Sequence, residues 1–192
     1  MAVITISRQT GSLGNMVAEE IGRCLGYKVV WREVINAAAI RAGVPEVALA
    51  TIDELNLLGI KPSAADLDAY HKAVKEIMFE IKEEGDAVIV GRAGQSILGG
   101  VPGVLHVRIF APFELRVARI AARHSVSEEI ARNQVKTSDH NRKQYLKRYY
   151  QINVDDPELY DVLINTERID PLVAAQVICS ALLTKSAPSQ TR

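Results

Sequence analysis

This sequence of 192 residues has few cysteines, no net charge and no long hydrophobic run. Its two cysteines, Cys24 and Cys179, belong to no CxxC pair and no Cys/His cluster, so they predict no metal site. Both lie in apolar helical patterns, and we expect them to be buried thiols. The four histidines also lack metal-ligand spacing, so no metal centre is predicted.

The charge balance argues against a partner that is recruited electrostatically. Lysine plus arginine and aspartate plus glutamate number 23 each, so no overall basic field would attract nucleic acid or anionic lipid. No run approaches the roughly 18 apolar residues of a membrane span, and the opening AVITIS lacks a basic start and a cleavage site. We therefore expect a cytoplasmic protein that binds neither nucleic acid nor membranes.

The composition is that of a globular protein, with 48% hydrophobic and 24% charged residues. We expect one domain over residues 1–185 and a flexible tail over 186–192. Apolar, β-branched runs predict strands at residues 2–7, 28–31, 87–90, 104–110 and 160–165. Helical spacing predicts helices at residues 16–25, 33–42, 64–84, 113–123, 125–150 and 171–183. Residues 44–66 carry only a weak pattern, and their role stays open.

Strands that alternate with helices predict an α/β fold with a mainly parallel sheet. Ligands of such sheets bind beyond the carboxyl ends of the strands. Two serines compete to begin the long helix at 125–150. Ser125 forms a Ser-x-x-Glu capping box with Glu128, and it is predicted as the cap ahead of Ser127.

A glycine-rich turn, Gly11-Ser12-Leu13-Gly14, joins the first predicted strand to the first helix. Backbone N–H groups of such a turn can point at phosphate oxygens, aided by the positive end of the helix dipole. The full phosphate loop is GxxxxGK[ST], and here Gln9, Asn15 and Met16 replace its first glycine, lysine and hydroxyl residue. On this stretch alone, an ordinary strand-to-helix turn is an equal alternative.

Five collinear segments resemble the cytidylate kinase-like proteins, a divergent branch of the nucleoside monophosphate kinases. The segments read ITISRQTGSLGNMVAEEIGRCLGY, VIVGRA, VRIFAP, KTSDHNR and YDVLINT, in the family's order over most of the chain. The resemblance implies a three-layer P-loop kinase-like fold with a helical lid at about 125–150. It also implies a nucleotide kinase that transfers the γ-phosphoryl group of ATP to cytidylate or another small phosphate acceptor, with Mg²⁺ accompanying the nucleotide.

The resemblance assigns ATP binding to two segments. They contain Gly11, Ser12, Leu13, Gly14, Asn15 and Met16 in the loop, and Asn165 and Thr166 after the last strand. In similar kinases the loop after that strand packs beside the adenine base. For Asn165 and Thr166, ordinary turn chemistry is an equally good explanation.

Arg92 directly follows a strand of the buried type. Its guanidinium would therefore emerge at the ligand-binding edge of the sheet, where it could grip a phosphate in a bidentate manner. In similar cytidylate kinases a Gly-Arg-Asp motif at this place helps to bind the acceptor, and Ala93 stands here in place of the aspartate. A surface salt bridge is the alternative role for Arg92.

Three charged residues, Lys136, Asp139 and Arg142, recur at a spacing of three and lie on roughly one helical face. The resemblance places them in the lid. Lys136 and Arg142 would then act as catalytic cations that neutralise the transferring phosphoryl group, while Asp139 would orient them and contact the acceptor. Arg8 is our candidate for the missing loop lysine. The alternative is a solvated charged face.

A second hypothesis follows from three gaps in the motifs. The loop lysine, the hydroxyl residue that binds magnesium and the aspartate after Arg92 are all absent. A catalytically impaired, nucleotide-binding regulatory protein of the same fold would show this combination.

Overall fold

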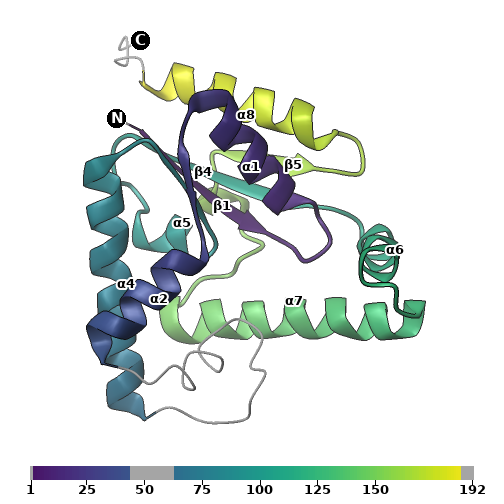
Figure 1. The fold of residues 1–192 in the computed structure, drawn as a ribbon, viewed down its shortest axis with the longest axis horizontal. Coiled ribbons are helices and arrows are strands. Elements are labelled where there is room, and N and C mark those ends of the chain that lie inside the picture. The colour runs from purple at the N-terminus through teal and green to yellow at the C-terminus, as the bar shows by residue number, and fades with distance from the viewer. Residues whose placement is uncertain (1, 44–62, 187–192) are drawn as a thin grey trace.

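The computed structural model describes residues 2–43 and 63–186, which form a parallel five-stranded sheet with helices on both faces (Figure 1). The strand order is β2-β3-β1-β4-β5. The strands are β1 (Val3–Arg8), β2 (Lys28–Val30), β3 (Ala87–Val90), β4 (Val104–Phe110) and β5 (Val162–Asn165). Every neighbouring pair is parallel, which confirms the α/β class predicted from the sequence.

The helices lie close to their predicted bounds. They are α1 (Gly14–Leu25), α2 (Arg32–Ala42), α4 (Ala64–Glu84), α5 (Gly94–Ile97), α6 (Phe113–His124), α7 (Glu128–Tyr150) and α8 (Pro171–Ser186). The sequence pattern did not predict α5, which has only four residues. Strand β5 begins two residues later than predicted because a short 3-10 helix, η1 (Pro157–Leu159), precedes it.

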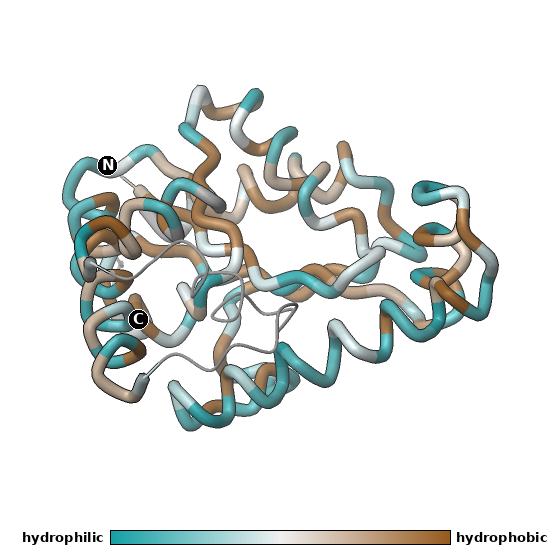
Figure 2. Tube along the Cα trace, turned by 60° about the horizontal axis from the view of Figure 1, so that its bottom comes forward, coloured by the Kyte–Doolittle hydropathy of each residue, from teal (hydrophilic) through white to brown (hydrophobic). Residues whose placement is uncertain are grey.

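Both faces of the sheet are buried, as expected for parallel strands that read as continuous apolar runs. Successive side chains of a strand point to opposite faces. Ile4 and Ile6 therefore pack with α1 and α8, whereas Val3 packs with α2 and α4. In Figure 2 the central strands are mainly hydrophobic in colour.

Helix α7 runs past the carboxyl ends of the strands (Figure 1). Its two ends are anchored by separate apolar clusters. At its beginning, Ala131 and Val135 pack with Val117 and Ile120 of α6. Near its end, Tyr145 and Leu146 pack with Ala93 and Val154. The helix is therefore fixed across the edge of the sheet where ligands are expected, and Figure 2 shows it as mainly hydrophilic.

Two local predictions are wrong. Ser125 does not begin α7; it ends α6 with φ at 52°, and Ser127 Oγ accepts the Ile130 N–H at 3.3 Å. The short link between the helices needs a left-handed residue at 125, which places the cap at 127. Cys179 is buried as predicted, but Cys24 is exposed.

Ser63 begins α4 by accepting the Asp66 N–H at 3.1 Å.

Some predictions fall on residues that the structure does not describe. Residues 44–62, most of the segment whose role is open, lie outside the described ranges, as do residues 187–192 of the predicted tail. Among the described helices, none has the length and apolar character that a membrane crossing needs.

Candidate active site

The glycine-rich turn folds as a tight loop between β1 and α1. Gly11 has φ at 81° and Leu13 has φ at 61°, so the backbone turns through the left-handed region twice. The Ser12 N–H and Oγ–H both donate to Gln9 O, at 3.2 and 2.8 Å. Helix α1 begins at Gly14, which directs the positive end of its dipole toward the loop.

Side chains from distant segments hold three consecutive carbonyl groups of this loop. Thr10 O accepts from Arg116 Nη1 at 3.2 Å, and Gly11 O accepts from Arg119 Nη1 at 3.3 Å. Ser12 O accepts from Thr166 Oγ1 at 2.9 Å. Carbonyl oxygens that are held in this way are kept from turning toward a phosphate, which they would repel. The loop is thus shaped for an anion by α6 and by the residue that follows β5.

Gly11→Ala is expected to destabilise the fold by about 1–3 kcal/mol. A Cβ at residue 11 would lie 2.8 Å from Arg116 O, and φ there is 81°. Gly100→Ala is the matched control, because Gly100 has φ at 73° with nothing within 4 Å of its Cβ position. Thermal unfolding of both variants measures the loss of stability. Equal losses in the two variants would contradict a role for the close contact with Arg116.

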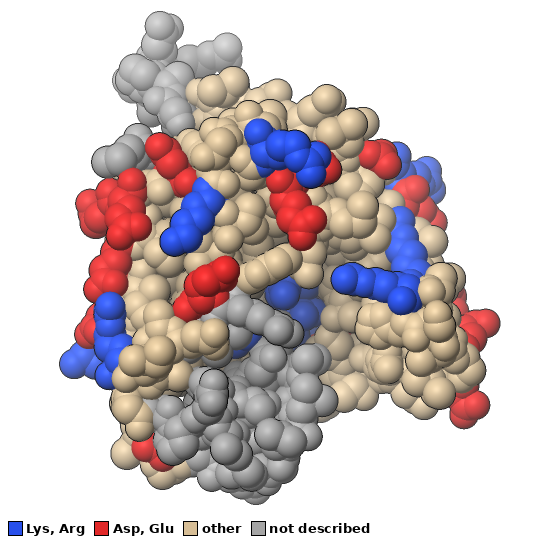
Figure 3. All heavy atoms as spheres, in the orientation of Figure 1, with Lys and Arg blue, Asp and Glu red and all other residues tan. Residues whose placement is uncertain are grey.

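Four buried arginines gather at the carboxyl edge of the sheet. Arg92 and Arg142 are each 7% exposed, Arg108 is 5% exposed and Arg116 is 3% exposed. Figure 3 shows lysine or arginine atoms within a recess at the centre of one face of the molecule. Buried cations are costly unless charge compensates them. A site rich in buried guanidinium groups is therefore suited to a polyanionic ligand.

Asp139 and Asp155 are described carboxylates that are hydrogen-bonded to members of this arginine cluster. Asp139 receives two bonds from Arg116, at 3.2 and 2.7 Å. Asp155 accepts from Arg108 Nη2 at 3.2 Å and pairs with Lys143 Nζ at 2.7 Å. Burial lowers the pKa of Arg108, and the nearby positive charge of Arg142 lowers it further. The cations at this edge are close enough to repel one another.

Residues 3–168 match the cytidylate kinase-like family. The chain belongs to this family. It is 27% identical over 180 residues to a cytidylate kinase of Natronomonas pharaonis, covering 94% of this chain and 88% of that protein. It is also 27% identical to a Corynebacterium glutamicum protein named uronate isomerase, over 70% of this chain but only 26% of that protein.

Solved structures share the fold of this family member. An uncharacterized protein from Eubacterium ventriosum superposes with a TM-score of 0.74 and 22% identity, over 96% of this chain and 99% of the other. Shikimate kinase from Acinetobacter baumannii superposes with a TM-score of 0.55 and 15% identity, over 98% and 96%. At these identities the likeness concerns the fold alone. Family and fold together support a P-loop, nucleotide kinase-like function.

The family's Gly-Arg motif is strained at Arg92. Three successive residues, Gly91, Arg92 and Ala93, have φ at 81°, 57° and 56°. Non-glycine residues are held in this region at a cost, and such strain is concentrated at functional sites. Ala93 packs under Tyr145 of α7, so the turn that carries Arg92 is fixed by the same helix that covers the edge of the sheet.

The three predicted lid residues of this family member differ in burial and in the residues that they contact. Arg142 is buried and Asp139 partly buried, whereas Lys136 is exposed and its positive charge acts on Glu114. Asp139 bonds to Arg116 of α6 rather than to Lys136. Ser138, between them, makes a 2.6 Å hydrogen bond with Thr10 of the loop. The described contacts therefore tie the middle of α7 to the phosphate loop.

The predicted loop residues at the start of α1 differ in their contacts. Arg8 Nε donates to Asn15 Oδ1 at 3.3 Å, and the Cβ of Arg8 lies against Gly14 on the α1 side of the sheet. Met16 is 51% exposed. Arg108 lies on the opposite face from Arg8, where its Nη1 donates to Ser7 Oγ at 2.8 Å.

The two predicted residues after β5 also differ from each other. Thr166 is buried, and its Oγ1 accepts from Arg119 Nη1 at 3.0 Å in addition to holding the loop. Asn165 Oδ1 accepts the Glu167 N–H at 3.0 Å, which is turn chemistry.

Sequence reasoning missed three arginines of the site: Arg108, Arg116 and Arg119. Arg108 interrupts the apolar run of β4, and a charge inside a buried strand is a signal that could have found it. It borders a cavity of about 210 Å³ together with Gln9, Asp155 and Tyr160. Arg116 and Arg119 stand one turn apart on α6, a spacing that by itself looks like an ordinary helix surface.

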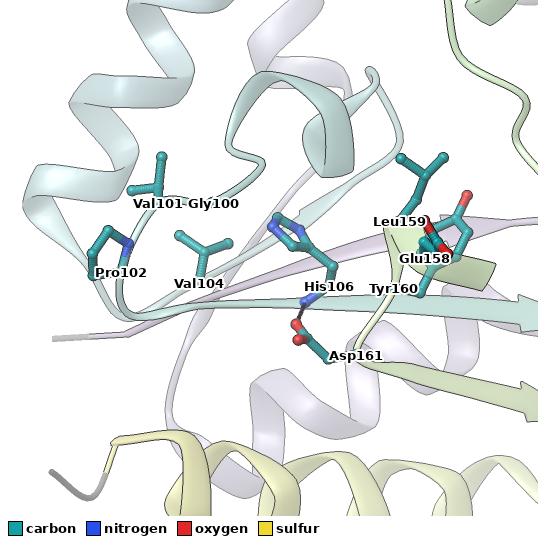
Figure 4. Close-up of a pocket in the computed structure, with 9 residues that line it drawn as sticks. All are labelled: Gly100, Val101, Pro102, Val104, His106, Glu158, Leu159, Tyr160 and Asp161. Atoms are coloured by element: carbon teal, nitrogen blue, oxygen red, sulfur yellow. Dashed lines mark hydrogen bonds between the residues drawn. The ribbon is translucent and has the colours of Figure 1, made fainter. Parts of the chain in front are cut away.

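A second cavity, of about 310 Å³, lies toward the amino-terminal half of β4, away from the loop (Figure 4). His106 projects into it, with Pro102 and Val104 on one side and Leu159 on the other. His106 is buried and its Nδ1 lies 2.7 Å from Thr5 Oγ1, so its ring is hydrogen-bonded within the core. The described residues contain no cluster of His, Cys, Asp or Glu that could hold a metal ion.

Acidification is expected to weaken the contact between α4 and α7 near Arg92. His71 of α4 lies 3.2 Å from Tyr150 Oη and 4.5 Å, between ring centroids, from Tyr149. Burial lowers the pKa of His71 from 6.5, and Asp68 partly opposes this. The unfolded chain therefore binds more protons than the folded one as the pH falls through and below 6.5, so the free energy of unfolding decreases there.

Urea unfolding at about pH 7.5 and about pH 5.5 measures this effect. His71→Gln should show a smaller loss of stability between the two values than the native protein. His140→Gln, on the exposed side of α7, is the control and should leave the difference unchanged. An undiminished pH dependence in His71→Gln would assign it to other groups.

Proposed function

We propose that this chain is an ATP-dependent nucleotide kinase that transfers the γ-phosphoryl group to a cytidylate-like nucleoside monophosphate. The observation that carries the proposal is the gathering of buried arginines at the edge of the sheet beside the glycine-rich loop. Arg92, Arg108, Arg116 and Arg142 lie at this edge, and three consecutive carbonyl groups of the loop are held by side chains of α6 and Thr166. The oxygens of a nucleotide polyphosphate and of an acceptor phosphate are the groups that guanidinium side chains bind best.

The reaction is an in-line displacement. An oxygen of the acceptor phosphate attacks the γ-phosphorus, and the bond from that phosphorus to the β–γ bridging oxygen breaks, which leaves ADP. Positioning and electrostatic stabilisation supply most of the catalysis of such transfers. The Gly11–Gly14 loop holds the donor phosphates, Arg92 grips the acceptor phosphate, and Arg142 from the lid helix α7 neutralises the charge between them.

Magnesium fits this site only as a companion of the nucleotide. Met16 is exposed in place of the usual hydroxyl residue, and among the described residues Asp139 and Asp155 are engaged by cations. The ion would therefore be held by phosphate oxygens and water, and when bound it would neutralise phosphate charge. Asp139 acts as a positioning residue through Arg116, which in turn holds Thr10 O.

The missing loop lysine has two candidate replacements on opposite faces of the sheet. Arg8 is bonded to Asn15, the residue at the lysine's own position. Arg108 lies on the same face of the sheet as Ser7. Burial lowers its pKa, and Arg142 is close enough for its positive charge to lower the pKa of Arg108 further. The variants Arg8→Met and Arg108→Met therefore distinguish the two candidates. Substitution of the arginine that takes the place of the lysine should lower kcat by about 10²–10³ with a small change in KM. An unchanged kcat in both variants would remove both candidates.

A coupled assay with ATP, magnesium and a panel of nucleoside monophosphates tests the proposal directly. We expect ADP release that depends on the acceptor, with cytidylate among the best acceptors. Small hydroxy acids such as shikimate are assayed beside this panel, because a solved structure with this fold binds shikimate. Preference for such an acceptor, or no transfer to any nucleotide, would overturn the proposed substrate class.

The alternative is a nucleotide-binding regulatory protein with impaired catalysis. It is favoured by the absence of the loop lysine, of the hydroxyl at Met16 and of the aspartate at Ala93. Tight ATP binding without turnover on any acceptor would select this alternative. Absence of ATP binding would contradict both functions and the phosphate loop itself.

A further inference from the structure

One buried stripe runs along helix α7, which passes the carboxyl ends of the strands (Figure 1). The stripe consists of buried residues that recur at helical spacing: Ala131, Val135, Ser138, Arg142, Tyr145 and Leu146. Its two ends belong to the apolar clusters that anchor α7. Its middle is polar, where Ser138 is 3% exposed and Arg142 is 7% exposed. Buried polar side chains require hydrogen-bond partners, so the partner of Ser138 shows what the middle of α7 faces.

Ser138 faces the phosphate loop. Its Oγ lies 2.6 Å from Thr10 Oγ1, in a hydrogen bond that spans 128 residues of sequence. The main chain of Thr10 is held from α7 by a second route, because Arg116 donates both to Thr10 O and to the Asp139 carboxylate. A hydrogen bond is short and directional, so the position of Thr10 depends on the position of α7.

The same helix supports residues 91–93, the Arg92 turn. Ser138 and Tyr145 are seven residues apart, close to two helical turns, so their side chains lie on one face of α7. Tyr145 packs with Ala93, and Ile97 of α5, which follows the turn, packs against the same cluster. The left-handed backbone of the turn persists only because its surroundings hold it there. A shift of α7 relative to the phosphate loop would therefore move the surface on which the Arg92 turn rests.

We propose that Ser138 is a positioning residue that couples the phosphate loop to the Arg92 turn through α7, so that a donor bound at the loop tightens binding of the acceptor at Arg92. This inference rests on the proposed function, which assigns the donor and acceptor phosphates to these two places. Donor phosphates on the loop restrict the motion of Thr10, and its hydrogen bond with Ser138 extends that restriction to α7. The acceptor then meets a turn that is already ordered and loses less conformational entropy on binding. Linkage requires the acceptor to tighten donor binding by the same factor.

Titration calorimetry of the full chain tests the coupling, with cytidylate as the acceptor probe. The Kd of cytidylate is measured without and with a saturating non-hydrolysable ATP analogue and magnesium, and the ratio of the two values is the coupling factor. We expect a coupling factor of about ten in the native protein and of less than about three in Ser138→Ala. Thr137→Ala is the matched control, because it removes an exposed hydroxyl from the neighbouring residue of α7 and should keep the full coupling factor.

Variants of Thr10 show whether the hydrogen bond itself carries the coupling. Thr10→Val removes the hydroxyl with little change of shape, whereas Thr10→Ser keeps the hydroxyl and should keep most of the coupling factor. The double variant of Ser138→Ala and Thr10→Val should lose no more of the coupling factor than either single variant, because all three lack the same bond. A lower thermal midpoint in Ser138→Ala with an unchanged coupling factor would show a structural role alone and overturn the proposal.

Hydrogen exchange with the ATP analogue alone separates this inference from the choice of acceptor. The Ser96 and Ile97 N–H groups of α5 donate to Ala93 O, at 2.7 and 2.9 Å, so their exchange reports on the Arg92 turn. The analogue should slow this exchange in the native protein but not in Ser138→Ala. A bound analogue that leaves the exchange of the native protein unchanged would overturn the coupling and leave the kinase function standing. Slower exchange without cytidylate binding would support the coupling and overturn the cytidylate-like acceptor, and an analogue that does not bind would overturn both.

Discussion

Arg92→Ala is expected to lower kcat/KM for the phosphate acceptor by about 10²–10³ while ATP affinity changes less than threefold. Arg92 is 7% exposed and is carried on a strained turn at the carboxyl end of β3. A charge-assisted contact in such a water-poor place is worth far more than one at the surface. Steady-state kinetics with the acceptor varied, and titration calorimetry with ATP, measure the two quantities separately.

Arg92→Lys is the control for charge alone. Lysine keeps the positive charge but loses the planar pair of donors that matches a phosphate. We expect Arg92→Lys to recover only a small part of the lost kcat/KM. Full recovery would show that Arg92 acts as a point charge, and an equal loss of ATP affinity in Arg92→Ala would place it at the donor site instead.

Much of the fold was readable from local patterns. The apolar runs at 87–90 and 104–110 gave β3 and β4 with their observed bounds, because strands buried on both faces must be apolar along their whole length. The predicted helix at 64–84 is α4, with Ser63 as its cap. The cap at Ser127 was missed because the capping-box rule weighs the Ser125 and Glu128 side chains, whereas the left-handed turn that ends α6 decides the outcome.

The site was less predictable because its geometry depends on contacts between distant segments. Thr166 holds Ser12 O across 154 residues of sequence, and Arg119 reaches Gly11 from α6. Nothing in the local pattern around Thr166 separates this role from turn chemistry. Asn165, beside it, does show turn chemistry. Residue type and spacing thus identified the segments that meet, but not which side chain of each segment makes the contact.

The spacing of Lys136, Asp139 and Arg142 illustrates the same limit. Three residues at a spacing of three drift around a helix of 3.6 residues per turn, so they share a face only approximately. In the structure the three residues point in different directions around the helix, so that Lys136 is exposed and Arg142 is buried. The buried partner of Asp139 is Arg116, from the neighbouring helix. An ion pair between helices has no sequence signature, whereas one within a helix does.

Asp139→Asn is expected to destabilise the protein by about 2–4 kcal/mol and to lower its thermal midpoint by about 5–12 °C. The Arg116 side chain is 4% exposed and makes two bonds to Asp139, at 3.2 and 2.7 Å. Removing the carboxylate charge leaves a buried guanidinium with less compensation. ATP affinity should fall as well, because the same Arg116 holds Thr10 O in the phosphate loop.

Glu114→Gln provides the matched control for this prediction. Glu114 also receives two bonds from one arginine, Arg132, both at 2.6 Å, but the side chains of this pair are 67% and 32% exposed. Exposed pairs contribute about 1 kcal/mol or less whatever their length. If Glu114→Gln destabilised the protein as much as Asp139→Asn, burial of the ion pair would not explain the contribution of Asp139 to stability. A large loss of stability in Asp139→Asn with unchanged ATP affinity would instead separate the ion pair from the loop.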